Sequence, residues 1–304
     1  MMVKLFTHTD LDGVGCAILA KIAFGSEVDI DYCNYNEIND KVNDFIVTEL
    51  ESDDMVHITD ISVSDELAND IDANSTQFYL FDHHPTAVEL NKYKWCKVTI
   101  EDIFTGLKTS GTELYYNWLV ENGYLDESDV LRRFVELVRN YDTWRWAELG
   151  STGTICKQVN DLLYLYGREK FITWCLSRIY DTTFPELYAA DKLVLDLKQK
   201  EIDDYIESKD SELIVSPMCG KICGFVFAEK YFSELGNRLC KLHPEIDFVA
   251  MIDMNGTVSY RTVKDDVDLG KDVASLFGGG GHPKAAGSRF SDEVKLKLIE
   301  NIFN

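Results

Sequence analysis

The sequence predicts an α/β protein, with a mostly parallel sheet flanked by helices in a first domain and a smaller α/β domain after it. Strand-length apolar runs alternate with helix-period segments from the start of the chain, which is typical of parallel sheets with helices on both faces. The pattern changes after about Leu213. A length of 304 residues is enough for about two domains.

The first domain opens with four expected strands, separated by three expected helices. The expected strands are the apolar run Val3–Thr7, followed by Val28–Tyr32, Met55–Ile61 and Gln77–Phe81. The helices carry apolar residues at helical spacing and cover Gly13–Phe24, Ile38–Leu50 and Asp65–Asn74. Ligands of such sheets bind at the carboxyl ends of the strands, so the residues after each run are candidates for a site.

Helices are expected to dominate the middle of the chain. The periodicity predicts them at Gly111–Tyr124, Glu127–Tyr141 and Lys157–Arg178, and over the long polar segment Pro185–Ser208. The polar segment suits a connector between domains or, equally, a surface helix. We therefore expect a first domain over 1–184, a linker helix over 185–209 and a second domain over 210–304.

The second domain is expected to mix strands and helices around a glycine-rich loop. The expected strands are Cys223–Ala228, Phe248–Asp253 and Thr257–Thr262, and the expected helices are Tyr231–Lys241 and Leu269–Leu276. Four consecutive glycines, Gly278–Gly281, then form a loop. Ordering four glycines costs much conformational entropy, so a close backbone approach to an anion is one explanation and a flexible hinge is the other.

Charge and hydropathy restrict the classes of partner. The net charge is −23 and no basic run is present, so long duplex nucleic acid is a poor substrate. No window is apolar enough to span a bilayer, and the N-terminus turns polar too soon for a signal peptide. The eight scattered cysteines fit reduced thiols. We expect a cytoplasmic protein with no membrane partner, and self-association stays open.

Acidic and histidine side chains follow three of the expected strands. They are His8, Asp10 and Asp12, then Asp60, and then Asp82, His83 and His84. Carboxylates that converge at one sheet edge repel one another unless a cation is present. Mixed oxygen and nitrogen ligands suit manganese or another divalent first-row metal. Two such ions can catalyse phosphoryl displacement, and Asp60 is the candidate for the bridging ligand.

Three further features allow competing interpretations. Asp142, in Tyr141-Asp142-Thr143-Trp144, is a candidate fourth acid or merely a cap for the next segment. His57 lies among apolar neighbours within an expected strand and is interpreted as structural. Gly13-Val14-Gly15 is no dinucleotide fingerprint, because the third glycine position holds Ile18 and acids precede the turn.

As a set, these residues resemble the four motifs of the DHH phosphoesterase family. The motifs are His8-Thr9-Asp10-Leu11-Asp12-Gly13, Asp60, Asp82-His83-His84 and Asp142. The C-terminal segments Ser259-Tyr260-Arg261 and Gly278–Gly287 resemble the DHHA1 substrate-binding domain of that family. The two parts together span nearly the whole chain. The opening Phe6–Cys16 and Tyr141-Asp142-Thr143-Trp144 most resemble the nanoRNase B type of oligoribonuclease.

The resemblance implies a role for each motif residue. His8, Asp10 and Asp60 would hold one Mn²⁺, and Asp12, Asp60, His83 and Asp142 the other, with Co²⁺ and Mg²⁺ as alternative ions. His84 would touch the scissile phosphate or support the ligands, and Asp82 would orient a histidine. In the second domain, substrate would be bound by Arg261, Gly278, Gly279, Gly280, Gly281 and His282.

The resemblance thus implies a manganese-dependent phosphodiesterase, an exonuclease that hydrolyses short single-stranded RNA (nanoRNA) to mononucleotides. A first alternative is hydrolysis of a cyclic or linear dinucleotide used in signalling. Hydrolysis of inorganic pyrophosphate is a weaker alternative, because the family members that do this have a different second domain. A non-catalytic nucleotide-binding module is the alternative from another class, and metal content together with turnover would separate it.

Overall fold

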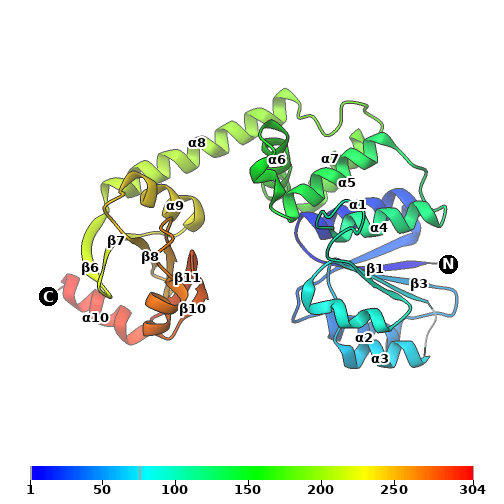
Figure 1. Cartoon of the computed structure of the whole chain (residues 1–304), viewed down its shortest axis with the longest axis horizontal. Helices are drawn as coiled ribbons and strands as arrows, with labels where there is room; N and C mark the ends of the chain where they lie inside the picture. The colour runs from blue at the N-terminus through cyan, green and yellow to red at the C-terminus, as the bar shows by residue number, and fades with distance from the viewer. Residues whose placement is uncertain (1, 75–76, 304) are drawn as a thin grey trace. The chain divides into compact units, whose positions relative to one another are not determined.

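The computed structural model describes residues 2–74 and 77–303, and the chain divides after Leu195 into two compact units (Figure 1). The division falls inside the long helix α8 (Ala189–Ser211), the segment that the sequence pattern set apart as a linker. The expected domain limits 1–184, 185–209 and 210–304 remain proposals. In the described part of the chain, no helix combines the length and the apolarity that crossing a membrane requires.

Unit 1 is built on a parallel five-stranded sheet with the order β2-β1-β3-β4-β5. The strands are β1 (Val3–Thr7), β2 (Val28–Tyr32), β3 (Met55–Thr59), β4 (Phe78–Asp82) and β5 (Cys96–Val98). Alternation along β1 sends Leu5 into one apolar core and Phe6 into the other, so both faces of the sheet are covered. This confirms the predicted sheet; only the short edge strand β5 was not foreseen.

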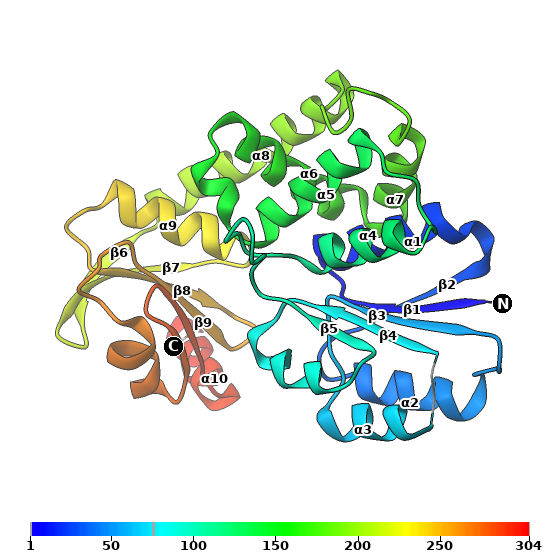
Figure 2. The ribbon, with the colours of Figure 1, turned by 45° about the vertical axis from the view of Figure 1, so that its right-hand side comes forward.

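Helices cover the two faces of this sheet unequally. In Figure 2, α2 and α3 lie on one side, whereas α1, α4, α5, α6 and α7 lie on the other. Their bounds are α1 (Leu11–Phe24), α2 (Ile38–Thr48), α3 (Asp65–Asn74), α4 (Gly111–Glu121), α5 (Asp129–Asp142), α6 (Ser151–Tyr166) and α7 (Arg168–Arg178). Short helical turns occupy η1 (Gly25–Glu27), η2 (Pro85–Lys92) and η3 (Arg145–Glu148).

Two predicted helices have different limits in the structure. The stretch expected over Lys157–Arg178 is two helices, because Gly167 adopts φ +75° and ends α6 before α7 begins. The helix expected over Pro185–Ser208 begins only at Ala189 and continues to Ser211.

Unit 2 contains a six-stranded mixed sheet with the order β10-β11-β9-β8-β7-β6. Only the β7–β8 pair is parallel. The strands are β6 (Ile214–Met218), β7 (Lys221–Phe227), β8 (Phe248–Asp253), β9 (Thr257–Arg261), β10 (Gly280–His282) and β11 (Ala285–Arg289). The helices are α9 (Phe232–Leu242) and α10 (Asp292–Phe303), together with the turns η4 (Leu269–Val273) and η5 (Ala274–Phe277).

Two expectations for unit 2 need correction. The helix predicted over Leu269–Leu276 is a π turn followed by a 3-10 turn. The four-glycine segment is not loop throughout, because Gly280 and Gly281 belong to the edge strand β10 and pair with β11. The small side chains of β11 permit this close pairing.

Candidate active site

Eight acidic and histidine side chains of unit 1 gather at the carboxyl edge of its sheet. They are His8, Asp10, Asp12, Asp60, Asp82, His83, His84 and Asp142. The first seven follow or end β1, β3 and β4, whose parallel registers bring their ends together. The eighth is the last residue of α5. The structure thus brings together all the residues that the sequence singled out in unit 1.

Asp60 lies at the centre of this cluster. Its Oδ2 is 3.8 Å from His8 Nδ1 and its Oδ1 is 3.3 Å from His83 Nε2. Asp60 is only 1% exposed and adopts φ +56°, which is rare for a residue other than glycine. Backbone strain of this kind persists only where the surrounding structure enforces it, and it is frequent at functional sites.

The ligand atoms fall into three compact groups. They are His8, Asp10 and Asp60; Asp12, His83 and Asp142; and Asp60, Asp82, His83 and His84. Within each group the candidate ligand atoms all lie within 4.8 Å of one another. Asp142 Oδ2 is 3.4 Å from His83 Nε2, so this carboxylate faces the cluster and does not cap the next segment. The structure thus places Asp142 in the cluster, and its role as a metal ligand stays a prediction.

Helix N-termini hold two of the carboxylates. Asp10 caps α1 by accepting from the amides of Asp12 and Gly13, each at 3.1 Å. Asp12 accepts at 2.6 Å from the Gly111 amide and at 2.9 Å from the Thr112 amide, in the first turn of α4. The two amides thus fix the position of the Asp12 carboxylate at the N-terminus of α4. Sequence analysis missed Gly111 and Thr112, which lie about 100 positions away from Asp12.

Glycines permit the close packing beneath the cluster. A Cβ on Gly111 would lie 2.7 Å from the Asp60 Cβ and 2.9 Å from its Cα. A Cβ on Gly13 would lie 2.2 Å from the His8 carbonyl oxygen. Each of these contacts is shorter than atoms tolerate, so a side chain at either position would displace a residue of the cluster.

Asp82 positions His84 at the margin of the cluster. His84 Nδ1 donates to Asp82 Oδ1 at 2.6 Å, and Ser62 donates to the other oxygen of the same carboxylate. His84 Nε2 is 3.3 Å from the Tyr35 hydroxyl, and the Tyr35 ring lies 5.0 Å from the His8 ring. A pocket of about 340 Å³ opens beside Tyr35, Asp82 and His84. Tyr35 is a further residue that sequence analysis missed.

The crowded carboxylates perturb one another's protonation. Burial, followed by the charges of Asp12 and Asp10, raises the pKa of Asp60 well above its usual range and that of Asp142 to about 8. Burial also opposes ionisation of Asp10, but interaction with His8 and the Gly13 amide outweighs it and lowers its pKa to about 2. Hydrogen bonding to Asp82 raises the pKa of His84.

The cluster has the properties that a divalent cation requires. Asp60 Oδ2 and His83 Nε2 are buried and lack hydrogen-bond partners in the structure, and the buried His8 Nδ1 lies 2.9 Å from Asp10 Oδ2 without an aligned hydrogen bond. Buried polar atoms are normally satisfied, so three such atoms at one place indicate that they share another partner. A cation bound between them would satisfy all three and would relieve the repulsion among the carboxylates. Carboxylate oxygens combined with imidazole nitrogens suit a first-row divalent metal.

His57 lies outside this cluster. It is fully buried, its Nδ1 is 2.7 Å from the Tyr115 hydroxyl, and its ring is surrounded by Phe24, Tyr79 and Trp118. Burial lowers its pKa to about 3. This environment agrees with the structural role predicted for His57.

Three candidate residues of unit 2, Arg261, Gly280 and His282, lie in two rows across its sheet, whereas Gly281 lies in the row between them and Gly278 and Gly279 precede β10. His282 on β10 pairs with Ala285 on β11, which pairs with Arg261 on β9. Directly paired residues of antiparallel strands point to the same face, so His282 and Arg261 flank a small side chain on one face. The other row is Gly280, Gly287 and Ser259. Small residues thus form a low surface between an imidazole and a guanidinium.

The four glycines differ in what the fold demands of them. Gly278 and Gly281 have positive φ angles of +67° and +141°. A Cβ on Gly279 would lie 2.1 Å from the Gly287 carbonyl oxygen. Gly280 has neither restriction, because no atom lies within 4 Å of the position of its Cβ. The local fold therefore explains three of the four glycines but leaves Gly280 unexplained.

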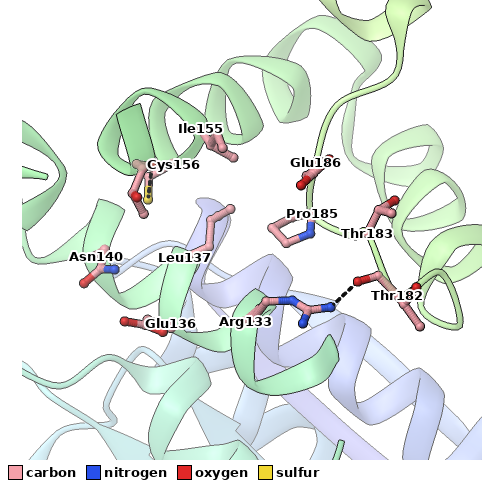
Figure 3. Close-up of a pocket in the computed structure, with 11 residues that line it drawn as sticks. Arg133, Glu136, Leu137, Asn140, Ile155, Cys156, Thr182, Thr183, Pro185 and Glu186 are labelled. Carbon is pink, nitrogen blue, oxygen red and sulfur yellow. Dashed lines mark hydrogen bonds between the residues drawn. The ribbon is translucent and has the colours of Figure 1, made fainter. Parts of the chain in front are cut away.

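A separate pocket of about 370 Å³ lies in unit 1 among α5, α6 and the segment 182–186 (Figure 3). Leu137, Ile155 and Pro185 line it, and Arg133 closes one side by donating to the Thr182 carbonyl at 2.5 Å. None of the eight cluster residues lines this pocket. It is therefore distinct from the candidate active site.

Comparisons with known proteins identify the family. No protein-family model matches the chain. Oligoribonuclease NrnB of Bacillus subtilis (strain 168) is 38% identical over 310 residues, which cover 99% of this chain and 76% of that protein. A 3',5'-cyclic-nucleotide phosphodiesterase of Helicobacter pylori (strain ATCC 700392 / 26695) is 21% identical over 356 residues, which cover 100% of this chain and 99% of that protein.

Solved structures support the same fold. Exonuclease RecJ bound to manganese matches with a TM-score of 0.57 at 12% identity, over 96% of this chain and 86% of that chain. At this identity the similarity shows the fold alone. The 38% identity to oligoribonuclease NrnB over nearly the whole chain goes further, and together with the DHH motifs it shows that the chain belongs to the DHH phosphoesterase family, in the group of that oligoribonuclease.

Proposed function

We propose that this chain is a two-metal phosphodiesterase that hydrolyses short RNA oligonucleotides to mononucleotides. The observation that carries the proposal is the position of Asp60, whose two oxygens face His8 on one side and His83 on the other. A carboxylate shared in this way is what two neighbouring ions need. The substrate class follows from the 38% identity to an oligoribonuclease.

His8, Asp10 and Asp60 would hold one ion, and Asp12, Asp60, His83 and Asp142 would hold the other. We propose Mn²⁺ as the ion because the ligands mix carboxylates with imidazoles, and Co²⁺ and Mg²⁺ are the alternatives. When bound, the two ions would activate a water and stabilise the leaving oxygen of the phosphodiester.

The remaining polar residues of the cluster would position the substrate. Hydrogen bonding to Asp82 holds the His84 ring in place and raises its pKa, so this ring carries positive charge at higher pH than a free histidine does. Its Nε2 faces the pocket beside Tyr35, where it would donate to a phosphate oxygen. In unit 2, Arg261, His282 and the backbone of Gly278–Gly281 would bind substrate phosphates.

A time course with Mn²⁺ tests this function directly. An RNA dinucleotide, a five-nucleotide RNA, a long single-stranded RNA and a cyclic dinucleotide are incubated side by side. We expect the short linear RNAs to become mononucleotides while the long RNA is spared. Preference for the cyclic substrate would retain the metal chemistry but reassign the substrate, an alternative that the Helicobacter pylori relative supports by its name.

Metal content separates the enzyme from a nucleotide-binding module. We expect two equivalents of metal per chain and loss of turnover on chelation, with recovery on addition of Mn²⁺. Nucleotide binding with no turnover in fully metallated buffer would instead identify a binding module. We also propose a cytoplasmic location and short single-stranded RNA as the partner, since a net charge of −23 disfavours long duplexes.

A further inference from the structure

Trp144 combines backbone strain with exposure. It lies two residues after Asp142, the last residue of the carboxylate cluster along the chain. It follows α5 with φ +63° and ψ +5°, the left-handed conformation, and it is 74% exposed. A bulky residue with positive φ is an outlier among folded proteins. The chain at this turn would adopt the same backbone more easily with glycine, which is the usual residue after a helix end.

Folding therefore does not explain the choice of tryptophan here. The Trp144 side chain is three-quarters exposed, so it contributes little to a core. Its left-handed backbone conformation is also unfavourable for tryptophan. Strain of this kind is an indication of function when it is observed at a site.

The Trp144 ring is supported by other aromatic rings. Its centroid lies 6.1 Å from that of Trp146 at an interplanar angle of 33°, and Trp146 stacks on Tyr141 at 6.1 Å and 19°. Helix α6 holds this turn closely, because a Cβ on Gly153 would lie 1.8 Å from the Trp146 carbonyl oxygen. The ring thus belongs to a packed aromatic group and presents an open face.

The aromatic group borders the proposed catalytic cluster. Trp144 is two residues from Asp142, so the two Cα atoms are at most about 7.6 Å apart. Asp142 in turn is 3.4 Å from His83.

We propose that Trp144 is the stacking surface for a nucleobase of the substrate next to the scissile phosphate. This inference rests on the proposed function. Every base has a flat π face, so stacking on an aromatic ring binds oligonucleotides without sequence preference. The chain has 53 acidic and 30 basic side chains, and this excess of negative charge repels a phosphate backbone, so stacking supplies affinity that electrostatics does not.

The decisive variant is Trp144→Gly, because glycine removes the ring and suits the left-handed backbone. We expect its Tm to equal or exceed that of the wild type. Its KM for an RNA dinucleotide should rise roughly 5- to 150-fold, the range of a lost base–aromatic stack, with kcat nearly unchanged. Trp144→Phe keeps a ring and should recover most of the affinity. Tyr180→Ala, which removes a ring that is 90% exposed elsewhere in unit 1, is the matched control.

A non-hydrolysable analogue separates this inference from the proposed function. We would measure binding of a dinucleotide with a methylene group in place of the bridging oxygen, and of its counterparts that lack one or the other base. Loss of one base should weaken wild-type binding but not binding to Trp144→Gly. Equal affinity of both proteins for the intact analogue would refute the stacking role. If ring-dependent binding persists while the wild type fails to cleave linear RNA, the stacking role stands and the proposed function fails.

Discussion

Replacing Asp142 with Asn should raise the free energy of unfolding of the metal-free protein. The same change should remove much of the stability that the protein gains on binding Mn²⁺. In the folded chain, burial and then the charges of Asp12 and Asp10 raise the pKa of Asp142 from 3.8 to about 8. Between these two values the folded state binds more protons than the unfolded state. The free energy of unfolding of the metal-free protein therefore falls as pH rises from about 4 to about 8.

The size of the effect follows from this difference in pKa. At pH 7 the cost accumulates at 1.36 kcal/mol for each pH unit above 3.8, which gives roughly 4 kcal/mol for keeping Asp142 protonated in the fold. Part of this cost comes from the charges of the neighbouring carboxylates, which change when the side chain is replaced. We therefore expect Asp142→Asn to raise the free energy of unfolding by about 2–4 kcal/mol, or Tm by about 5 °C or more.

Thermal melts at pH 5 and pH 7, with EDTA and with Mn²⁺, measure both parts of this prediction. With EDTA, the variant should melt above the wild type at pH 7 and by a clearly smaller margin at pH 5. With Mn²⁺, the wild type should gain stability by mass action, whereas the variant should gain much less. A variant that melts below the wild type in EDTA at pH 7, or that retains the full gain with Mn²⁺, would refute the electrostatic reasoning.

Further substitutions probe the remaining parts of the site. Asp60→Ala should abolish turnover by removing the shared ligand, and activity retained with saturating Mn²⁺ would rule out the bridging role. Gly111→Ala should weaken Mn²⁺ binding in a calorimetric titration, because the new Cβ would meet Asp60 at 2.7 Å; unchanged affinity would show that the cluster can adjust. His282→Ala should raise KM more than it lowers kcat. Gly280→Ala should leave Tm unchanged but raise KM. Gly279→Ala should lower Tm, because the new Cβ would lie 2.1 Å from the Gly287 carbonyl oxygen. Equal Tm values for the two variants would contradict this distinction.

Periodicity was sufficient to predict most of the sheet in unit 1. The bounds of β1 and β2 agree with the prediction, because β1 is a short apolar run and β2 alternates apolar with acidic residues. The edge strand β5 was missed, since Cys96–Val98 is three residues long and carries too little pattern to recognise. The break at Gly167 was missed as well, because glycine is tolerated within helices and only its positive φ reveals the turn.

The catalytic candidates could be read from the sequence because their positions depend on topology alone. Parallel neighbouring strands end at the same edge, so acids that follow them must meet there. The supporting contacts have no such local signal. Tyr35 lies against His8 and His84 from another part of the chain. Nothing in the sequence marks Tyr35 as a neighbour of these histidines.

Local periods and local motifs were thus enough to predict the sheet, its carboxyl edge and the acids and histidines that gather there. Three features became visible only in the folded chain: Asp142 faces His83, the first turn of α4 holds Asp12, and Gly280 is free of steric demand. These outcomes depend on the packing of segments far apart in the chain. Such packing selects among local alternatives that the residues leave equally open.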